Sequence, residues 1–117
     1  MGILSTGPIE NNSLEGIRPT QRITVKIINR DPTNSSDVLI QGYFLNGFRT
    51  LYVLELFTLG PNEIITKDYF ANFDAFEFVF TTSGPAEKNT EVSVWGKNDS
   101  GELIISHRLV SEEQLGR

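Results

Sequence analysis

The stretch VLIQGYFLNGFRTLYVLELF, residues 38–57, joins two apolar runs through the dipeptide Asn46-Gly47. Asn and Gly tolerate the positive φ angles of a two-residue type I′ turn, so this stretch predicts a β-hairpin whose register follows from its turn. Leu45 would then face Phe48. On one face the expected partners are Tyr43 with Thr50, Gln41 with Tyr52 and Leu39 with Leu54, and on the other Phe44 with Arg49, Gly42 with Leu51 and Ile40 with Val53.

Both faces of this expected hairpin are mostly apolar. An antiparallel sheet in a small protein usually buries one face in its own core. The second face must then be covered by more chain or by another molecule. The hairpin is therefore the first indication that the protein assembles.

Length and composition favour one globular domain. The chain has 117 residues, 38% of them hydrophobic, with eight Phe, three Tyr and one Trp. A single core suits this length, and the apolar content argues against disorder over most of it. Its net charge is −5 and its basic residues are scattered, which disfavours nucleic acid and anionic lipid as partners.

Several classes of site lack their usual residues. The chain has no Cys, so disulfides and thiolate metal sites are not expected. No apolar run approaches the roughly 20 residues of a membrane helix, and the N-terminus lacks the features of a secretory signal. No glycine-rich loop precedes a helix, so no nucleotide cofactor is predicted.

Residues 1–20 are too polar to form a core of their own. One interpretation is a disordered leader. The other is a connector whose spaced aliphatic side chains add a strand to a neighbouring subunit. The residues expected at that interface are Ile3, Leu4, Ile9, Leu14 and Ile17.

Period-two patterns from Ile23 onward predict seven strands and no amphipathic helix of useful length. Phe76, Phe78 and Phe80 fall on one face of a strand and are expected in the core. The fold class predicted is all-β, a single antiparallel β-sandwich of jelly-roll or Greek-key type with an extended N-terminal connector. The expected divisions are a connector at 1–20, a sandwich at 21–112 and a tail at 113–117. The leader could supply an eighth strand, from its own subunit or the next.

A four-residue loop, residues 98–101, would close the last hairpin. This register pairs Lys97 with Glu102 and Glu91 with Arg108, two opposite-charge pairs at once. It places Val92, Val94, Leu103, Ile105, His107 and Leu109 inward, and Ser93, Trp95, Ile104 and Ser106 outward.

Catalytic chemistry has little support, and the protein is not expected to be an enzyme. With no Cys and one His, a nucleophile and base are hard to assemble, and His107 is expected in the core. An adventitious calcium ion at Asp68 or Asp74 stays open beside the plainer interpretation of solvated loop carboxylates. No catalytic, metal or cofactor residue is therefore predicted.

Exposed aromatic and aliphatic side chains are the strongest functional signal. Trp95 and Ile104 are expected to face outward among polar neighbours, as an interface patch inside a polar rim would. Trp95 merely covering a neighbouring loop is the alternative. Tyr43, Tyr52 and Trp95 could also stack on carbohydrate.

Four segments of the chain resemble small spore-surface proteins of Bacillus- and Paenibacillus-type bacteria. They are ITVKIINRDP at 23–32, VLIQGYFLNG at 38–47, DYFANFDAFEF at 68–78 and VSVWGK at 92–97, and the resemblance spans Ile23 to Val110. It implies membership of the endospore-appendage group, whose jelly-roll subunits polymerise through an N-terminal connector. Connector cysteines cross-link the best-known appendage subunits. Because this chain has no Cys, its polymer would rely on strand pairing and apolar burial.

The leading hypothesis is a self-assembling structural subunit of a spore-surface fibre or layer. Its connector would dock into a neighbouring subunit, with copies of itself and other spore-coat or exosporium proteins as partners. Synthesis in the mother cell, which the resemblance implies, would explain the lack of a signal peptide. The rival hypotheses are a carbohydrate-binding or adhesive module and a hydrolase-like enzyme centred on His107.

Overall fold

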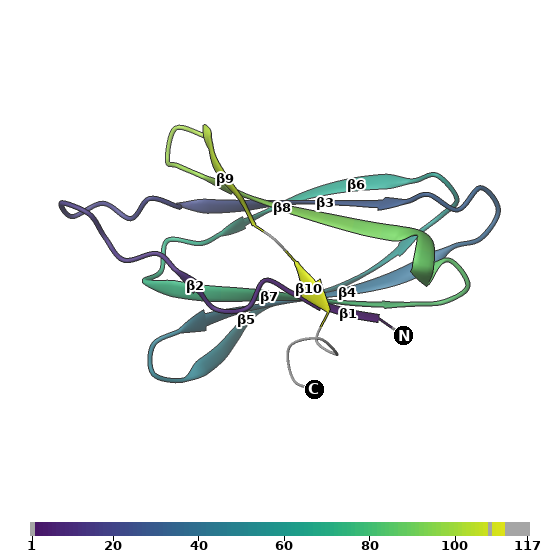
Figure 1. Ribbon diagram of the computed structural model, residues 1–117, viewed down its shortest axis with the longest axis horizontal. Coiled ribbons are helices and arrows are strands. Elements are labelled where there is room, and N and C mark those ends of the chain that lie inside the picture. Colours follow the sequence, from purple (N-terminus) through teal and green to yellow (C-terminus); the bar gives the residue numbers. More distant parts are fainter. Residues whose placement is uncertain (1, 108, 112–117) are drawn as a thin grey trace.

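Two antiparallel β-sheets packed face to face form the protein, as the sequence predicts (Figure 1). The computed structural model describes residues 2–107 and 109–111, with only the backbone for the last two. The six-stranded sheet has the order β10-β1-β7-β4-β5, with β2 also paired to β7, and the four-stranded sheet has the order β6-β3-β8-β9.

The bounds of the strands follow from the period-two patterns. In the six-stranded sheet they are β1 (Gly2–Ser5), β2 (Ile9–Glu10), β4 (Ser36–Leu45), β5 (Arg49–Leu59), β7 (Ala75–Ser83) and β10 (Val110–Ser111). In the four-stranded sheet they are β3 (Arg22–Asn29), β6 (Ile64–Phe70), β8 (Thr90–Lys97) and β9 (Leu103–His107). A single 3₁₀ turn, η1 (Glu87–Asn89), is the one helical element of the described residues, and no helix there is long and apolar enough to cross a membrane.

The core lies between the two sheets. Phe76, Phe78 and Phe80 project inward from β7 and are fully buried, which confirms the prediction from their spacing. Their facing partners include Ile23, Val25 and Ile27 of β3, also fully buried. Burying each large apolar side chain contributes roughly 1.5–3 kcal/mol, so these three positions in β7 are central to stability.

The segment 2–20 belongs to the fold of its own chain. β1 pairs with β7 on one side and β10 on the other, and Leu4 packs against the core. Asn11 is buried, and its amide nitrogen donates hydrogen bonds to the carbonyl oxygens of Thr20 at 2.8 Å, Phe73 at 2.9 Å and Ala71 at 3.2 Å. The leader thus supplies a strand to its own subunit, while insertion into a neighbouring subunit stays a prediction.

The β4–β5 hairpin exists, but its predicted register is wrong. Leu45 pairs with Arg49 rather than with Phe48, because the loop takes three residues and Gly47 is its one residue with positive φ, at 91°. A type I′ turn would need positive φ at Asn46 as well. The ladder then shifts beside Gly42, which pairs with Val53 and leaves Tyr52 as an extra residue on β5.

Close packing explains where this shift occurs. A Cβ added at Gly42 would lie 2.9 Å from both the Phe78 ring and the Val53 Cβ, so the strands approach too closely there for any side chain. Past the bulge the expected partners change, and Leu39 pairs with Leu56 and Gln41 with Leu54.

The register predicted for the last hairpin is also wrong. Lys97 pairs with Leu103, and after a bulge Trp95 pairs with Ser106 and Val94 with His107. The loop is longer than expected because the Asn98 side chain accepts hydrogen bonds from the backbone N–H groups of Ser100 and Glu102.

The charge pairs expected from that register change with it. Lys97 does not pair with Glu102, whose carboxylate instead accepts a hydrogen bond from Asn98. Glu91 forms its ion pair with Arg30, at 2.9 Å. Arg108, its expected partner, lies outside the described residues. Leu103 is exposed rather than inward-facing.

Candidate functional site

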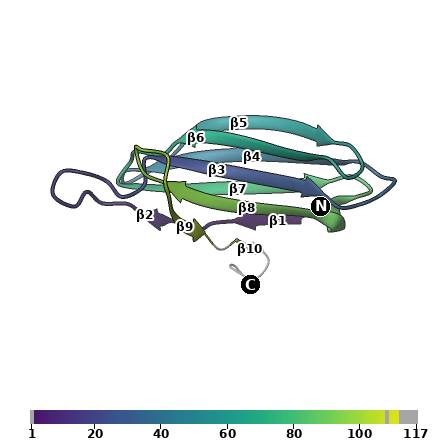
Figure 2. The same ribbon diagram turned by 90° about the horizontal axis from the view of Figure 1, so that it is seen from above.

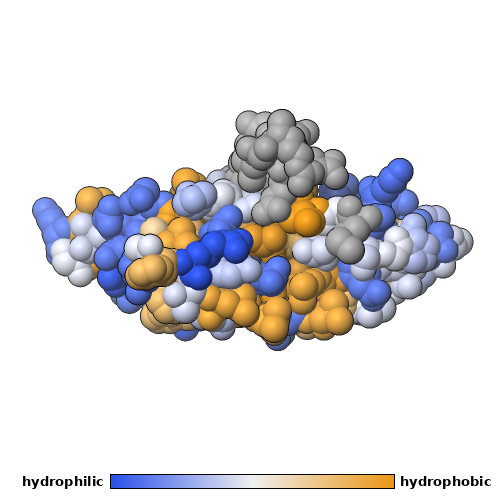
Figure 3. Space-filling model, turned by 90° about the horizontal axis from the view of Figure 1, so that it is seen from below, coloured by the Kyte–Doolittle hydropathy of each residue, from blue (hydrophilic) through white to orange (hydrophobic). Residues whose placement is uncertain are grey.

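The outer face of the six-stranded sheet gathers several exposed leucine side chains. Leu51, Leu54 and Leu56 of β5 are 43%, 60% and 68% exposed and alternate with inward residues. Leu39 of β4 pairs with Leu56, so the same surface continues from the edge strand β5 onto β4. We call these four residues the leucine face. Figure 3 shows the molecule from the side of this sheet, with hydrophobic side chains gathered along the lower middle of the view.

An ion pair limits the leucine face toward the β4–β5 turn. The Arg49 guanidinium lies 2.9 Å from the Glu77 carboxylate and 3.7 Å from the centre of the Tyr43 ring. Tyr43 therefore faces outward as expected, but the arginine covers its ring. A cation over the ring face is attracted by the aromatic quadrupole, and this contact competes with any ligand stacking there.

The leucine face ends at an unpaired sheet edge. β5 pairs only with β4 and has 11 residues without Pro or Lys. β6, which forms the edge of the other sheet, lies on the same side of the sandwich (Figure 2). Arg49 and Glu55 are the only charged residues of β5, and a long edge with few charges and no Pro is a template for pairing with another chain.

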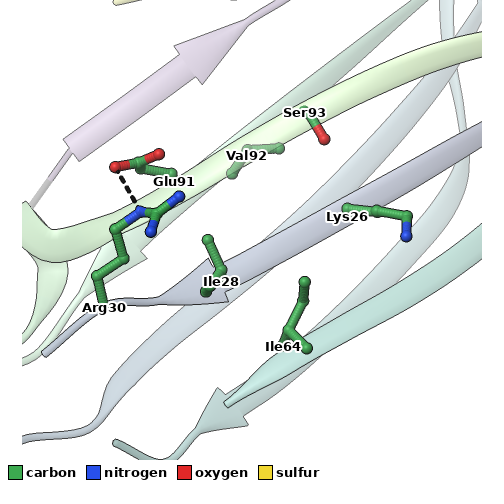
Figure 4. Close-up of a pocket in the computed structure, with 7 residues that line it drawn as sticks. All are labelled: Lys26, Ile28, Arg30, Ile64, Glu91, Val92 and Ser93. Carbon is green, nitrogen blue, oxygen red and sulfur yellow. Dashed lines mark hydrogen bonds and ion pairs between the residues drawn. The ribbon is translucent and has the colours of Figure 1, made fainter. Parts of the chain in front are cut away.

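The outer face of the four-stranded sheet has a different chemistry. A hollow of about 530 Å³ is lined by Thr24, Lys26, Ser93, Trp95, Lys97, Gly101 and Leu103. A second hollow of about 260 Å³ shares Lys26 and Ser93 and continues toward the Arg30–Glu91 ion pair (Figure 4). We call the larger hollow the Trp95 groove.

Trp95 lies partly exposed in this groove. Its indole N–H donates a hydrogen bond to the Ser93 hydroxyl at 3.3 Å, which directs the ring along β8. Its strand neighbours fix what surrounds it, because Thr24 pairs with Trp95 and Lys26 with Ser93. The prediction that Trp95 faces outward among polar residues is confirmed.

The predicted interface residues do not form one surface. Leu4 and Ile9 pack against the core, whereas Ile3 is half-buried. Leu14 and Ile17 are 69% and 65% exposed and bridge each other in a small projecting hairpin.

Two further predicted residues have different surroundings. Ile104 of β9 is 46% exposed next to Leu103. Tyr52 is not an outward platform, because the bulge turns it inward against the rings of Phe44, Phe73 and Phe78. Its hydroxyl donates a hydrogen bond to the carbonyl oxygen of Phe70, and burial raises its pKa.

Residues proposed for catalysis or metal binding have other roles here. His107 lies beside the Phe76 ring, its Nε2 atom has no hydrogen-bond partner, and burial lowers its pKa. Asp68 accepts a hydrogen bond from the Thr24 hydroxyl, and Asp74 pairs with Arg18 at 2.9 Å. The described residues hold no group of three or more His, Cys, Asp or Glu placed to bind a metal ion.

The sequence reasoning missed two sets of functional candidates. The predicted register put Leu54 opposite Leu39, whereas in the structure Leu56 pairs with Leu39 and Leu54 with Gln41. Lys97 lies two positions after Trp95 on β8, whereas Lys26 becomes a neighbour of Trp95 only because β3 lies beside β8. Strand order across the sheet carries no local sequence signal.

Comparison with known proteins supports the fold and goes no further. No family model and no curated protein matches the chain. The crystal structure of Thermotoga maritima 1070 is similar, with a TM-score of 0.55 and 8% identity over 94% of this chain and 89% of that one. The Anabaena sensory rhodopsin transducer has a TM-score of 0.47 and 14% identity, over 80% of this chain and 94% of that one. The protein is thus a β-sandwich with two chemically different outer faces.

Proposed function

We propose that this protein is a self-associating structural subunit that builds a fibre or layer on the surface of bacterial spores. The observation that carries the proposal is the leucine face, which leaves three side chains between 43% and 68% exposed next to an open sheet edge. The spore surface as the location rests on the resemblance of the four sequence segments.

The size of the leucine face argues for more than one contact per subunit. Strands lie about 4.8 Å apart and rise about 3.4 Å per residue, so the two strands that carry this face, with about eight residues each, present roughly 260 Å². A stable interface buries about 800 Å² on each partner. The face alone falls short of this area. Further contacts, beginning with strand pairing through the edge of β5, would have to supply the rest.

Two contacts of this kind have a structural consequence. A face that packs on its own copy forms a closed two-fold pair. An edge that continues a sheet into the next subunit adds a second direction of growth. Subunits carrying both contacts extend into fibres or layers instead of stopping at dimers.

The segment 2–5 offers a third link between subunits. β1 pairs with β7 over four residues and is joined to β2 through Gly7-Pro8, where Gly7 has a φ of 66°. The same strand donated by a neighbouring subunit would make identical contacts. Such an exchange needs only a change in the connecting segment, which makes it a low-cost route to assembly.

The test is to place charges on the leucine face. The variant Leu54→Glu/Leu56→Glu changes two outward side chains, so we expect a folded monomer that no longer associates. Sedimentation velocity over a range of concentrations and negative-stain microscopy of the purified protein measure this directly. The matched control is Ile64→Glu/Leu103→Glu, because these residues are 54% and 62% exposed on the other sheet.

The outcomes separate the possible contacts. Assemblies that persist in the Leu54→Glu/Leu56→Glu variant would contradict the proposal. A wild-type protein that stays monomeric at high concentration would do the same. Deletion of residues 2–8 tests the exchange of β1 on its own, since loss of fibres with retained dimers would assign fibre growth to that strand.

A further inference from the structure

We propose that the Trp95 groove binds an acidic saccharide, with the indole ring stacking on a sugar and Lys26 and Lys97 pairing with its carboxylates. This inference concerns the four-stranded sheet and does not rest on self-association through the leucine face. Three observations carry it: the distribution of unpaired cations, the placement of the aromatic ring and the size of the hollow.

Unpaired positive charge is concentrated on this one face. Among residues 2–107 and 109–111, ion pairs engage Arg18, Arg30, Arg49 and Lys67. No recorded ion pair engages the other cationic side chains of these residues, which are Arg22, Lys26, Lys88 and Lys97. Three of those four, all except Lys88, lie on the outer face of the four-stranded sheet.

This concentration is unexpected in an acidic protein. The chain carries a net charge of −5, so carboxylates outnumber cations and partners for the lysines are plentiful. A cluster of cations left without partners favours a ligand that supplies the negative charge. An anionic ligand therefore complements this face, and no other part of the described surface gathers unpaired cations in this way.

The strand register places both lysines around the aromatic ring. Lys97 follows Trp95 by two positions on β8, so both point to the same face, about 7 Å apart along the strand. Lys26 lies on the adjacent strand β3, opposite Ser93. The strand positions of Lys97 and Lys26 thus lie on opposite sides of Trp95 along the groove.

Small polar groups complete the groove. The Ser93 hydroxyl accepts the indole N–H, which leaves its own proton free to donate to a sugar hydroxyl. Leu103 adds an apolar wall. A hollow of about 530 Å³ falls in the range of small-ligand sites, and the adjoining hollow of about 260 Å³ allows a chain of sugar rings to continue past Lys26.

The same residues suit nucleic acid less well. Binding of single strands combines several stacking platforms with a basic groove that follows the phosphates. One aromatic ring lines the Trp95 groove, and the net charge of −5 repels a dense polyphosphate. A short saccharide with a few carboxylates needs only the two lysines and the ring.

Trp95 is the only tryptophan of the chain, so its fluorescence reports on the groove directly. We would titrate the full-length protein with trigalacturonic acid and, in parallel, with the neutral galactotriose. The acidic sugar should change the emission saturably and bind at least tenfold more tightly than the neutral one. Raising the salt concentration from 50 to 500 mM should weaken this binding, because exposed ion pairs are screened.

Variants test the assigned residues. Lys26→Gln and Lys97→Gln should each weaken trigalacturonate binding several-fold, and the double variant at least tenfold. Lys88→Gln removes one exposed, unpaired positive charge from η1 and should leave binding unchanged. Trp95→Leu should abolish binding in isothermal calorimetry, with circular dichroism and thermal melting confirming that the variant is folded.

Several results would overturn the inference. They are equal binding of the neutral sugar, equal loss in the Lys88→Gln control, or no response to trigalacturonate at 10 mM. Tighter binding of a short oligothymidylate would assign the groove to nucleic acid and would equally overturn it. Repeating the titration with the Leu54→Glu/Leu56→Glu variant separates this inference from the proposed function, since binding should survive the loss of assembly.

Discussion

The two sheets bury similar inner faces but present opposite outer ones. β5 places the exposed apolar side chains of Leu51, Leu54 and Leu56 on the outside of the six-stranded sheet. β3 and β8 place Lys26 and Lys97 around Trp95 on the outside of the four-stranded sheet. The inner residues of a sandwich hold the fold together, so side chains on the outer faces are free to carry interactions.

This difference points to a division of roles. The apolar face suits a partner with the same surface, because hydrophobic burial is non-directional and a two-fold pair is self-complementary. The basic face suits a partner of opposite charge, which a second copy of an acidic subunit does not offer at the same patch. The variants below are chosen to break this contrast or to sharpen it.

The largest loss of stability is expected for a core residue that packs between the two sheets and so supports both outer faces. Phe78 is fully buried, and its ring contacts those of Tyr52, Tyr69 and Phe76. Phe78→Ala should lower the free energy of unfolding by about 3–5 kcal/mol, because it removes a large apolar side chain and leaves a cavity. Urea denaturation followed by circular dichroism measures this loss, and Phe48→Ala, at a position 81% exposed, is the control.

Self-association and saccharide binding should both fall with Phe78→Ala, because the variant weakens the core under both faces. A loss below about 1 kcal/mol would contradict the central place given to this ring. An unchanged fold with only one interaction lost would show that the two faces have separate supports.

The next effect concerns the buried amide that anchors the leader. The Asn11 side chain donates to three carbonyl oxygens and accepts the N–H of Thr20 at 2.9 Å. Asn11→Ala leaves these backbone groups buried without partners and should destabilise the fold by about 2–3 kcal/mol. Asn12→Ala, whose side chain is exposed and bonds to Glu10, should change stability by less than about 0.5 kcal/mol.

Hydrogen exchange of the residues in β1 and β7 gives a second measure. If Asn11→Ala leaves exchange unchanged across both strands, the amide does not anchor the leader. Faster exchange confined to β1 would instead identify the leader as a unit that can detach for strand exchange, which would sharpen the contrast between a rigid basic face and an exchangeable edge.

The sequence predicted the inner faces of the sandwich well and the edges poorly. Phe76, Phe78 and Phe80 repeat with period two, and that pattern depends only on the alternation of side chains along a strand. The register of a hairpin, by contrast, changes when its loop is longer or shorter by a single residue. Asn46-Gly47 fits a two-residue turn equally well, and neither the three-residue loop nor the bulge beside Gly42, which lies against Phe78 36 positions away, has a local signal.

The candidate sites were predictable to a smaller extent. Trp95 was identified from its position in an alternating strand, whereas its neighbour Lys26 depended on which strands are adjacent. Asn11 gave no signal at all, since its partners near Ala71 lie 60 positions away. Long-range pairing of this kind cannot be read from local pattern, which explains why the leader appeared too polar to fold.

A smaller change in the free energy of unfolding should come from the protonation of His107 as the pH falls. Burial holds the pKa of His107 below its ordinary value of 6.5, so the unfolded chain takes up a proton before the folded one does. Stability is therefore complete above about pH 6.5 and declines as the pH falls below it, by at most about 1.4 kcal/mol per pH unit for one proton. Urea unfolding at pH 7.5, 6.5 and 5.5 measures this slope.

The matched variant for this prediction is His107→Leu, which keeps an apolar group beside Phe76 and cannot take up a proton. The slope between pH 7.5 and 5.5 should be smaller in the variant than in the wild type. An identical slope in both proteins would show that other groups cause it.

The smallest effect on stability is expected at the basic face itself. Lys26 and Lys97 form no recorded ion pair within the described chain, so Lys26→Glu/Lys97→Glu removes no stabilising contact. The free energy of unfolding should change by less than about 0.5 kcal/mol, as for most surface substitutions. Sedimentation velocity should show unchanged self-association, because the leucine face lies on the other sheet. A loss of stability above 1 kcal/mol, or a loss of association, would mean that these lysines serve the fold or the assembly, and the separation of the two faces would fail.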